Sequence, residues 1–160
     1  MKILVSACLI GLNTTYSGGN NIDSSLIGIL KENHVPFYPL CTEQLGGLTT
    51  PREPAEIEKG YTSTDVLQGR ARVLTENGTD VTKHYIKGAK SILKFCKEFQ
   101  ITHAILQERS PACGFTKVYD GTFSSKLIPG VGILTKLLID NDIQIVRPEE
   151  LNVLLKQFRE

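Results

Sequence analysis

The feature that most constrains the fold is the alternation of short apolar runs with segments of helical period. The run 2–7 is continuously apolar after its lysine and contains β-branched residues, and a glycine-containing loop follows it. Runs of this length are typical of strands buried on both faces of a parallel sheet. Asp23 or Ser24 can then cap a helix that ends at about Asn33, and 36–40 is a second short apolar run. This order predicts a βαβ unit with a right-handed connection.

The same patterns continue along the chain. They predict a mostly irregular segment over 42–77 with a short strand at 72–75, a long helix from Asp80 to about Phe99, a strand at 102–107, a loop-rich segment over 108–129, a helix from Pro129 to Asn141, a strand at 143–146 and a terminal helix from Pro148. We therefore predict an α/β fold with three layers, a mostly parallel sheet with helices on both faces in a Rossmann-like arrangement. A length of 160 residues favours one domain over 1–160.

Charge and hydropathy exclude several kinds of partner. Eighteen basic and seventeen acidic side chains leave a formal net charge of +1, and the basic residues look scattered along the sequence. No overall field draws the protein to nucleic acid or to an anionic membrane. No apolar run reaches the roughly 18 residues of a membrane span, and the first apolar stretch is too short for a secretory signal. We expect a soluble cytoplasmic protein.

Three of the four cysteines follow predicted strands. Cys8 comes after the first strand, Cys41 after the second, and Cys113 lies beyond the strand at 102–107. Because ligands bind beyond the carboxyl ends of the strands in an open parallel sheet, these thiols can converge at one edge. Cys96 lies instead on the apolar stripe of the long helix, where a small core residue is the natural interpretation.

Three converging thiols have two uses, metal binding and thiol chemistry. Thiolates favour the soft metals zinc, copper(I) and iron in iron–sulfur clusters. Structural zinc commonly uses four ligands in short paired spacings, and this sequence has no C-x-x-C pair. A cluster held by three thiolates fits better, because one iron then lacks a protein ligand and is open to a substrate. The alternative is that the cysteines are buried and bind nothing.

Two polar residues near these cysteines are candidates for chemistry. Glu43 stands two residues after Cys41 and can act as an acid or a base, although a solvated loop glutamate is the alternative. Ser110 precedes Cys113 in the run Ser-Pro-Ala-Cys-Gly, which is also an ordinary turn sequence. No catalytic Cys–His pair is supported, and we interpret the three histidines as structural: His34, His84 and His103.

Four segments together resemble those of the thiouracil desulfidase family, a small bacterial domain long without an assigned function. The resemblance runs in order from the first strand to the terminal helix and covers essentially the whole chain. The segments that carry it are SACLIGLN at 6–13, CTEQLGGLTTPR at 41–52, RSPACG at 109–114 and YDGTFS at 119–124.

The resemblance implies a [4Fe-4S] cluster and a non-redox hydrolysis. The matching cluster ligands are Cys8, Cys41 and Cys113. In the chemistry proposed for the family, the thiocarbonyl sulfur of a thiolated pyrimidine binds the open iron and water attacks the ring carbon, which yields the oxo base and sulfide. No electron donor is required.

The resemblance also implies roles for individual side chains. The glutamate of the C-x-E-Q motif, here Glu43, relays protons, and the serine of the S-P-x-C-G motif, here Ser110, orients the substrate. Substrate contacts are implied for Asn13, Arg52 and Ser110.

Two departures from the family pattern concern the loops. Many relatives carry Asn-Cys-Arg-Tyr-Asp-Gly in the first loop, where this chain has Asn-Thr-Thr-Tyr-Ser-Gly at 13–18. Relatives also frequently carry a lysine before the serine motif, and this lysine is absent here, where the region holds Gln107 and Glu108. We expect the substrate contacts of these loops to differ. The alternative function is a non-catalytic iron–sulfur or soft-metal module for sensing or storage. A third reading is an interaction domain with simply buried cysteines.

Overall fold

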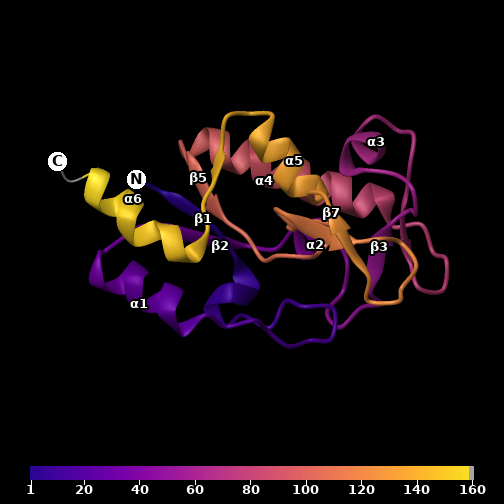
Figure 1. The fold of residues 1–160 in the computed structure, drawn as a ribbon, viewed down its shortest axis with the longest axis horizontal. Coiled ribbons are helices and arrows are strands. Elements are labelled where there is room, and N and C mark those ends of the chain that lie inside the picture. The colour runs from indigo at the N-terminus through magenta and orange to yellow at the C-terminus, as the bar shows by residue number, and fades with distance from the viewer. Residues whose placement is uncertain (159–160) are drawn as a thin grey trace.

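The computed structural model describes residues 1–158 and is organised around a parallel sheet of four strands (Figure 1). In spatial order these are β2 (Phe37–Leu40), β1 (Ile3–Ser6), β5 (His103–Ile105) and β8 (Gln144–Ile145). Ile3 is in register with Phe37 on one side and with His103 on the other, so β1 lies in the interior of the sheet. The predicted α/β class with a parallel sheet is confirmed.

Helices pack against both faces of this sheet (Figure 1). On one face, α4 (Thr82–Glu98) and α5 (Ile133–Ile139) form a buried apolar cluster with Leu4 and Ala104 of the sheet. On the other, α1 (Ser24–Glu32) and α6 (Leu151–Gln157) pack against Ile3, Val5 and Ile105, and the 3-10 helix η2 (Pro148–Glu150) leads into α6. Successive residues of a strand point to opposite faces, so the apolar run of β1 supplies both clusters.

The capping residues identified in the sequence lie at or beside the helix starts. The carboxylate of Asp23 accepts a hydrogen bond from the backbone amide of Leu26 at 2.9 Å, which confirms the predicted start of α1. Asp80 accepts from the amide of Thr82 at 3.0 Å, and α4 begins at that threonine. Cys96 is completely buried in the apolar cluster beneath α4, as its place on the apolar stripe predicts.

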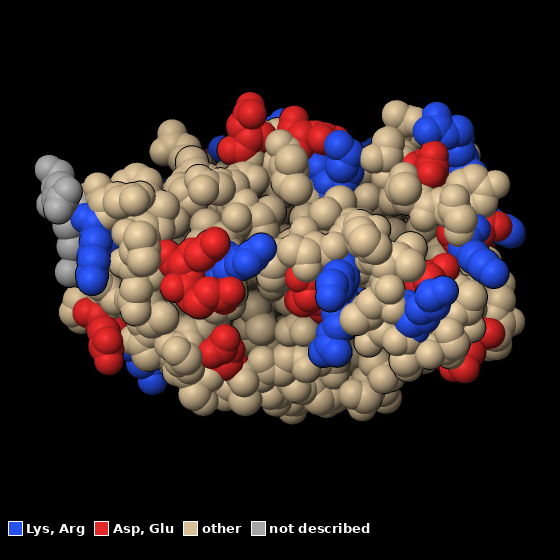
Figure 2. Space-filling model, in the orientation of Figure 1, with Lys and Arg blue, Asp and Glu red and all other residues tan. Residues whose placement is uncertain are grey.

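Charged side chains are mixed on the face of the molecule seen in Figure 2, with no large patch of one sign. Helix α4 departs from this pattern, because its exposed lysines fall at helical spacing on one side of the helix. The basic residues are therefore less scattered than the sequence suggested. These lysines are Lys83, Lys87, Lys90, Lys94 and Lys97.

The segment 42–77 is mostly irregular, as predicted, but it holds more secondary structure than the single strand that the sequence indicated. Besides β4 (Val73–Thr75), which confirms the short predicted strand, it contains α2 (Thr42–Leu45), β3 (Ala55–Ile57) and α3 (Ser63–Leu67). Strands β3 and β4 pair antiparallel as a small separate sheet. These elements are too short for a hydrophobic period to register, and they are held by contacts with distant parts of the chain.

The loop-rich segment 108–129 also contains secondary structure that the sequence did not reveal. Strands β6 (Lys117–Tyr119) and β7 (Leu127–Pro129) form an antiparallel pair, and Pro129 ends β7 instead of opening a helix. A proline at the end of a strand in a two-stranded sheet removes no essential hydrogen bond. Helix α5 starts only at Ile133. Within residues 1–158, no helix is long and apolar enough to span a bilayer.

Candidate functional site

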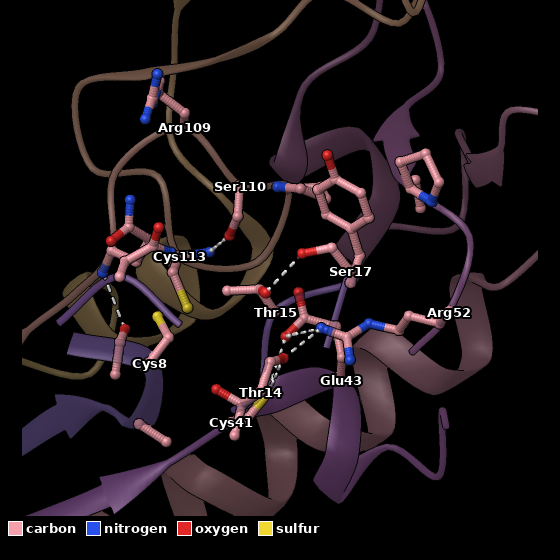
Figure 3. A pocket seen from close by; sticks show the side chains of 18 of the residues that line it. Cys8, Thr14, Thr15, Ser17, Cys41, Glu43, Arg52, Arg109, Ser110 and Cys113 are labelled. Atoms are coloured by element: carbon pink, nitrogen blue, oxygen red, sulfur yellow. Dashed lines mark hydrogen bonds and ion pairs between the residues drawn. The ribbon is translucent and has the colours of Figure 1, made fainter. Parts of the chain in front are cut away.

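The carboxyl ends of β1, β2 and β5 open onto a pocket of about 370 Å³ that three cysteines line together (Figure 3). Cys8 lies in the 3-10 helix η1 (Ala7–Ile10) directly after β1, and Cys41 lies between β2 and α2. Cys113 comes from the segment between β5 and β6. All three are free thiols. The structure therefore brings together the three cysteines that the sequence singled out.

Helix α2 holds Cys41 and Glu43 through a close contact with α4. A methyl group on Gly88 of α4 would overlap the carbonyl oxygen of Thr42, and one on Gly46 would overlap the carbonyl oxygen of His84. The Nδ1 atom of His84 also lies 2.8 Å from the carbonyl oxygen of Gly46. Glycine at both positions lets the two backbones approach closely, and this contact fixes α2 at the edge of the pocket.

The segment that carries Cys113 is attached to the start of α5. The carbonyl oxygens of Pro111 and Ala112 accept the backbone amides of Ile133 and Leu134, at 2.8 and 2.9 Å. These amides begin a helix and have no partner within it, so the loop satisfies them. The hydroxyl oxygen of Ser110 accepts the amide of Cys113 at 2.7 Å.

Glu43 is buried in the first turn of α2, with 8 % of its surface exposed. The interpretation of a solvated loop glutamate is therefore wrong. The Sγ atom of Cys41 donates to Oε2 of Glu43 at 3.4 Å, and the same oxygen lies 3.9 Å from the guanidinium of Arg52. The Glu43 carboxylate thus lies between the Cys41 thiol and the guanidinium of Arg52.

Arg52 is already engaged by the protein. Its guanidinium donates to the carbonyl oxygen of Thr14 at 2.9 Å and to the hydroxyl oxygen of Thr50 at 3.1 Å, besides facing Glu43. These bonds tie α2 to the first loop. If Arg52 contacts a substrate, as predicted, its guanidinium must bind the substrate and these protein partners at the same time.

Burial raises the pKa of all three pocket thiols, and the nearby charge of Glu43 adds to the effect. The pKa of Cys41 rises to about 11. A bound cation reverses this preference, because thiolates are the ligands of metals and metal binding releases their protons. The donor set therefore suits a cationic iron–sulfur group.

The number of cysteines at the pocket fits a cluster with one open iron. Among residues 1–158, no group of three histidine, cysteine, aspartate or glutamate side chains is placed so that it could hold a metal ion. In a cluster each thiolate binds a different iron. Three cysteines on one pocket without a fourth match a cluster in which one iron lacks a protein ligand.

The remaining predicted site residues divide into two groups. Ser110 lines the pocket, whereas Asn13 is exposed and is not among the lining residues. The side-chain oxygen of Asn13 accepts from Asn20, which does line the pocket, at 2.8 Å. None of the histidines His34, His84 and His103 lines it.

Several lining residues escaped sequence reasoning. Tyr85 is 3 % exposed and lies on the apolar stripe of α4, so the sequence gives it only a core role, yet it also lines the pocket. The hydroxyl of Ser6 accepts the amide of Gln107 at 2.9 Å and contacts the Cys113 thiol. Its position two residues before Cys8 in the first motif was the available signal. Tyr119 and Arg109 also line the pocket.

The first loop lines the pocket with hydroxyl groups. The Oγ1 atom of Thr15 lies 3.2 Å from the Oγ atom of Ser17, and both residues line the pocket beside Tyr16. Thr15 and Ser17 stand where many relatives carry an arginine and an aspartate. In this chain two neutral side chains therefore bond to each other at these positions.

Comparison with known proteins gives a consistent result. Residues 3–150 match the family model of 2-thiouracil desulfurase. An uncharacterized protein of Bacillus subtilis (strain 168), YbbK, is 41 % identical over 153 residues, which is 96 % of this chain and 99 % of that protein. Among solved structures, a [4Fe-4S]-dependent thiouracil desulfidase, TudS, matches with a TM-score of 0.82 and 35 % identity, over 99 % of this chain and 97 % of that one.

Proposed function

The chain belongs to the 2-thiouracil desulfurase family, and from this membership we propose that it is a [4Fe-4S]-dependent desulfidase that converts a thiolated pyrimidine into the oxo base and sulfide. The observation that carries the proposal is the convergence of three free cysteines and one buried carboxylate on a single pocket. A sulfur-specific reaction needs a soft metal centre beside a proton-transfer group, and these residue types supply both.

Cys8, Cys41 and Cys113 are the proposed cluster ligands. When bound, the cluster supplies a Lewis-acidic iron that polarises the thiocarbonyl group, without net electron transfer. Cys8 and Cys113 are buried at the pocket, whereas Cys41 is partly exposed. Because their pKa values are raised by burial, loading the site releases protons.

Glu43 is the proposed proton-relay group. Its carboxylate takes a proton from the attacking water and returns it to the departing sulfur, which leaves as hydrosulfide. The second proton of the water is then lost to solvent through the same carboxylate, so the water oxygen becomes the new oxo group. Arg52 holds this carboxylate from behind, and its bonds to Thr14 and Thr50 keep the guanidinium in place. We therefore assign Arg52 an indirect role, through Glu43, beside the substrate contact that the resemblance implies.

Ser110 is proposed to orient the substrate from the opposite wall. Its oxygen accepts the amide of Cys113, which leaves the hydroxyl hydrogen free to point into the pocket. A direct role for Asn13 receives no support from the geometry, because this residue is exposed and reaches the pocket only through Asn20.

The fold and the location are part of the same proposal. The apolar clusters on the two faces of the sheet support a three-layer, Rossmann-like domain that spans the whole chain. A cluster bound by three free thiols needs a reducing compartment, which supports a cytoplasmic enzyme whose partner is a small thiolated base or nucleoside.

The test is anaerobic assembly of the cluster followed by turnover of 2-thiouracil, with sulfide and uracil measured in parallel. Replacing Glu43 by glutamine should leave the visible spectrum of the cluster intact and lower turnover by about 100-fold or more. The exposed Glu98 of α4, changed to glutamine, is the control. Full turnover in Glu43→Gln overturns the proton-relay role. A loaded wild-type protein that releases no sulfide from thiolated bases favours a sensing or storage module.

A further inference from the structure

The carboxylate of Glu108 lies inside the loop that carries Cys113 and gathers its backbone amides. Its Oε1 atom accepts four N–H groups, from Arg109, Phe115, Thr116 and Lys117, at 3.2, 2.8, 3.0 and 3.1 Å. Its Oε2 atom accepts the hydroxyl of Thr116 at 2.6 Å. Backbone amides that converge in this way form an anion-binding concavity, and here the anion is a side chain of the loop itself.

No strand of the main sheet extends into this loop. Strand β5 ends at Ile105 and β6 begins at Lys117, and the β-pairing described for the segment between them is one isolated bridge from Arg109 to Val118 of β6. Arg109 itself has a φ of +77°, a left-handed conformation that costs energy for a residue with a side chain. The bonds to Glu108 join the first residue of the loop to its last three and offset this strain.

Hydrogen bonds also keep Glu108 ionised. Burial by itself raises the pKa of this carboxyl, but the bonds from Thr116, Lys117 and Phe115 outweigh it and the net pKa is lowered. Among the described residues, no lysine or arginine forms an ion pair with it. The backbone amides and the Thr116 hydroxyl, and not a cation, therefore stabilise this charge, which ties the carboxylate to one loop conformation.

We propose that Glu108 is a positioning residue for Cys113: by closing the loop 108–117 around its carboxylate, it presents the Cys113 thiol and the Ser110 hydroxyl to the pocket. The part of this inference that concerns a cluster rests on the proposed function. The part that concerns the placement of Cys113 does not.

Glu56 provides a matched control. This buried carboxylate of β3 also accepts backbone amides, those of Gly121 and Phe123 at 3.1 Å each, and the turn that contains these two residues carries no cysteine. Replacing Glu56 by alanine therefore removes a comparable set of bonds without touching the Cys113 loop.

The first measurement uses the cluster-free full chain. Alkylation by iodoacetamide, followed by mass spectrometry of each cysteine, should be about tenfold or more faster at Cys113 in Glu108→Ala than in the wild type, because the loop opens more often. Cys96, in the core, should react at an unchanged rate in both. Glu56→Ala should leave Cys113 as protected as in the wild type. An unchanged rate at Cys113 in Glu108→Ala overturns the inference, whether or not the protein binds a cluster.

The second measurement uses the loaded protein and a chelator. Glu108→Ala should lose iron about 10- to 100-fold faster than the wild type, in line with the effect of residues that orient metal ligands. Glu108→Gln should restore most of the retention, because an amide oxygen still accepts the backbone amides, and this variant also serves if Glu108→Ala fails to fold. Loss of iron from Glu108→Ala at the rate seen in Glu56→Ala overturns the inference. A wild-type chain that takes up no iron while Cys113 of Glu108→Ala reacts faster contradicts the proposed function and supports the positioning role.

Discussion

The two sides of the thiol pocket are built in different ways. On one side, Cys8 and Cys41 follow strands that are hydrogen-bonded to each other in register along their whole length. On the other side, Cys113 lies in an irregular loop that is closed by the carboxylate of Glu108 and attached to the start of α5. Strand pairing uses backbone groups that almost every residue has, whereas the loop depends on particular side chains. We therefore expect amino-acid substitutions to have different effects on the two sides of the pocket.

The largest effect should come from the thiols themselves. If both sides hold one cluster, Cys8→Ala and Cys113→Ala should each reduce the iron content from about four per chain to nearly none. Cys96→Ala, in the core, should keep the iron and lose about 1 kcal/mol of stability. Iron and sulfide assays after anaerobic assembly measure this. Full iron content in either pocket variant contradicts the shared site.

The strand side can be disturbed without touching a ligand. Gly88→Ala should push α2 away from α4, destabilise the protein by about 1–3 kcal/mol and displace Cys41 and Glu43, so that turnover falls further than iron content. Gly28 of α1 has no atom near an added methyl group, and Gly28→Ala should stabilise the protein by about 0.5–1 kcal/mol. Urea unfolding and turnover of the two variants decide the point. Equal behaviour of the two variants contradicts the close-contact account.

The raised thiol pKa values predict how the empty pocket responds to alkali. The pKa of Cys41 is about 11 in the folded chain, against an ordinary value of 9.0. The stability that this group contributes is full below pH 9 and is lost as the pH rises toward 11, because the unfolded chain ionises first. Cys41→Ser should show a smaller loss over this range. Thermal melts of the cluster-free proteins from pH 8 to about 11 test this. A melting temperature that falls equally in both contradicts the assignment to Cys41.

The smallest effect concerns Asn13. Because this side chain is exposed and lies outside the pocket lining, bonding to the lining residue Asn20, Asn13→Ala should change KM and kcat by about twofold or less. Steady-state kinetics on 2-thiouracil measure both constants. A tenfold rise in KM would contradict this prediction and support the direct substrate contact that the family resemblance implies.

The strand side was largely predictable from sequence. Continuous apolar runs identified β1 and β2, the capping Asp23 placed α1, and the rule that ligands gather at the carboxyl ends of parallel strands put Cys8 and Cys41 together. Each of these inferences rests on local pattern or on general topology, which a single sequence carries.

On the loop side, the position of Cys113 beyond the strand at 102–107 and the motif around it predicted its place at the pocket, but not the structure of its loop. The hairpin of β6 and β7 has three residues in each strand, too few for alternation to show, and Pro129 reads equally as a helix start. Glu108 looks like an ordinary polar residue in sequence, because its partners lie up to nine residues away on the backbone. Backbone amides carry no sequence signal, so only the structure shows what this carboxylate holds.

The most direct test of the central claim is a Mössbauer spectrum of the anaerobically loaded protein, recorded with and without 2-thiouracil. If Cys8, Cys41 and Cys113 leave one iron without a protein ligand, the base should shift the signal of about one quarter of the cluster iron and leave the rest unchanged. A spectrum that 2-thiouracil does not alter, in protein with a full cluster, would contradict the claim that the two sides of the pocket hold an open iron for the sulfur of the substrate.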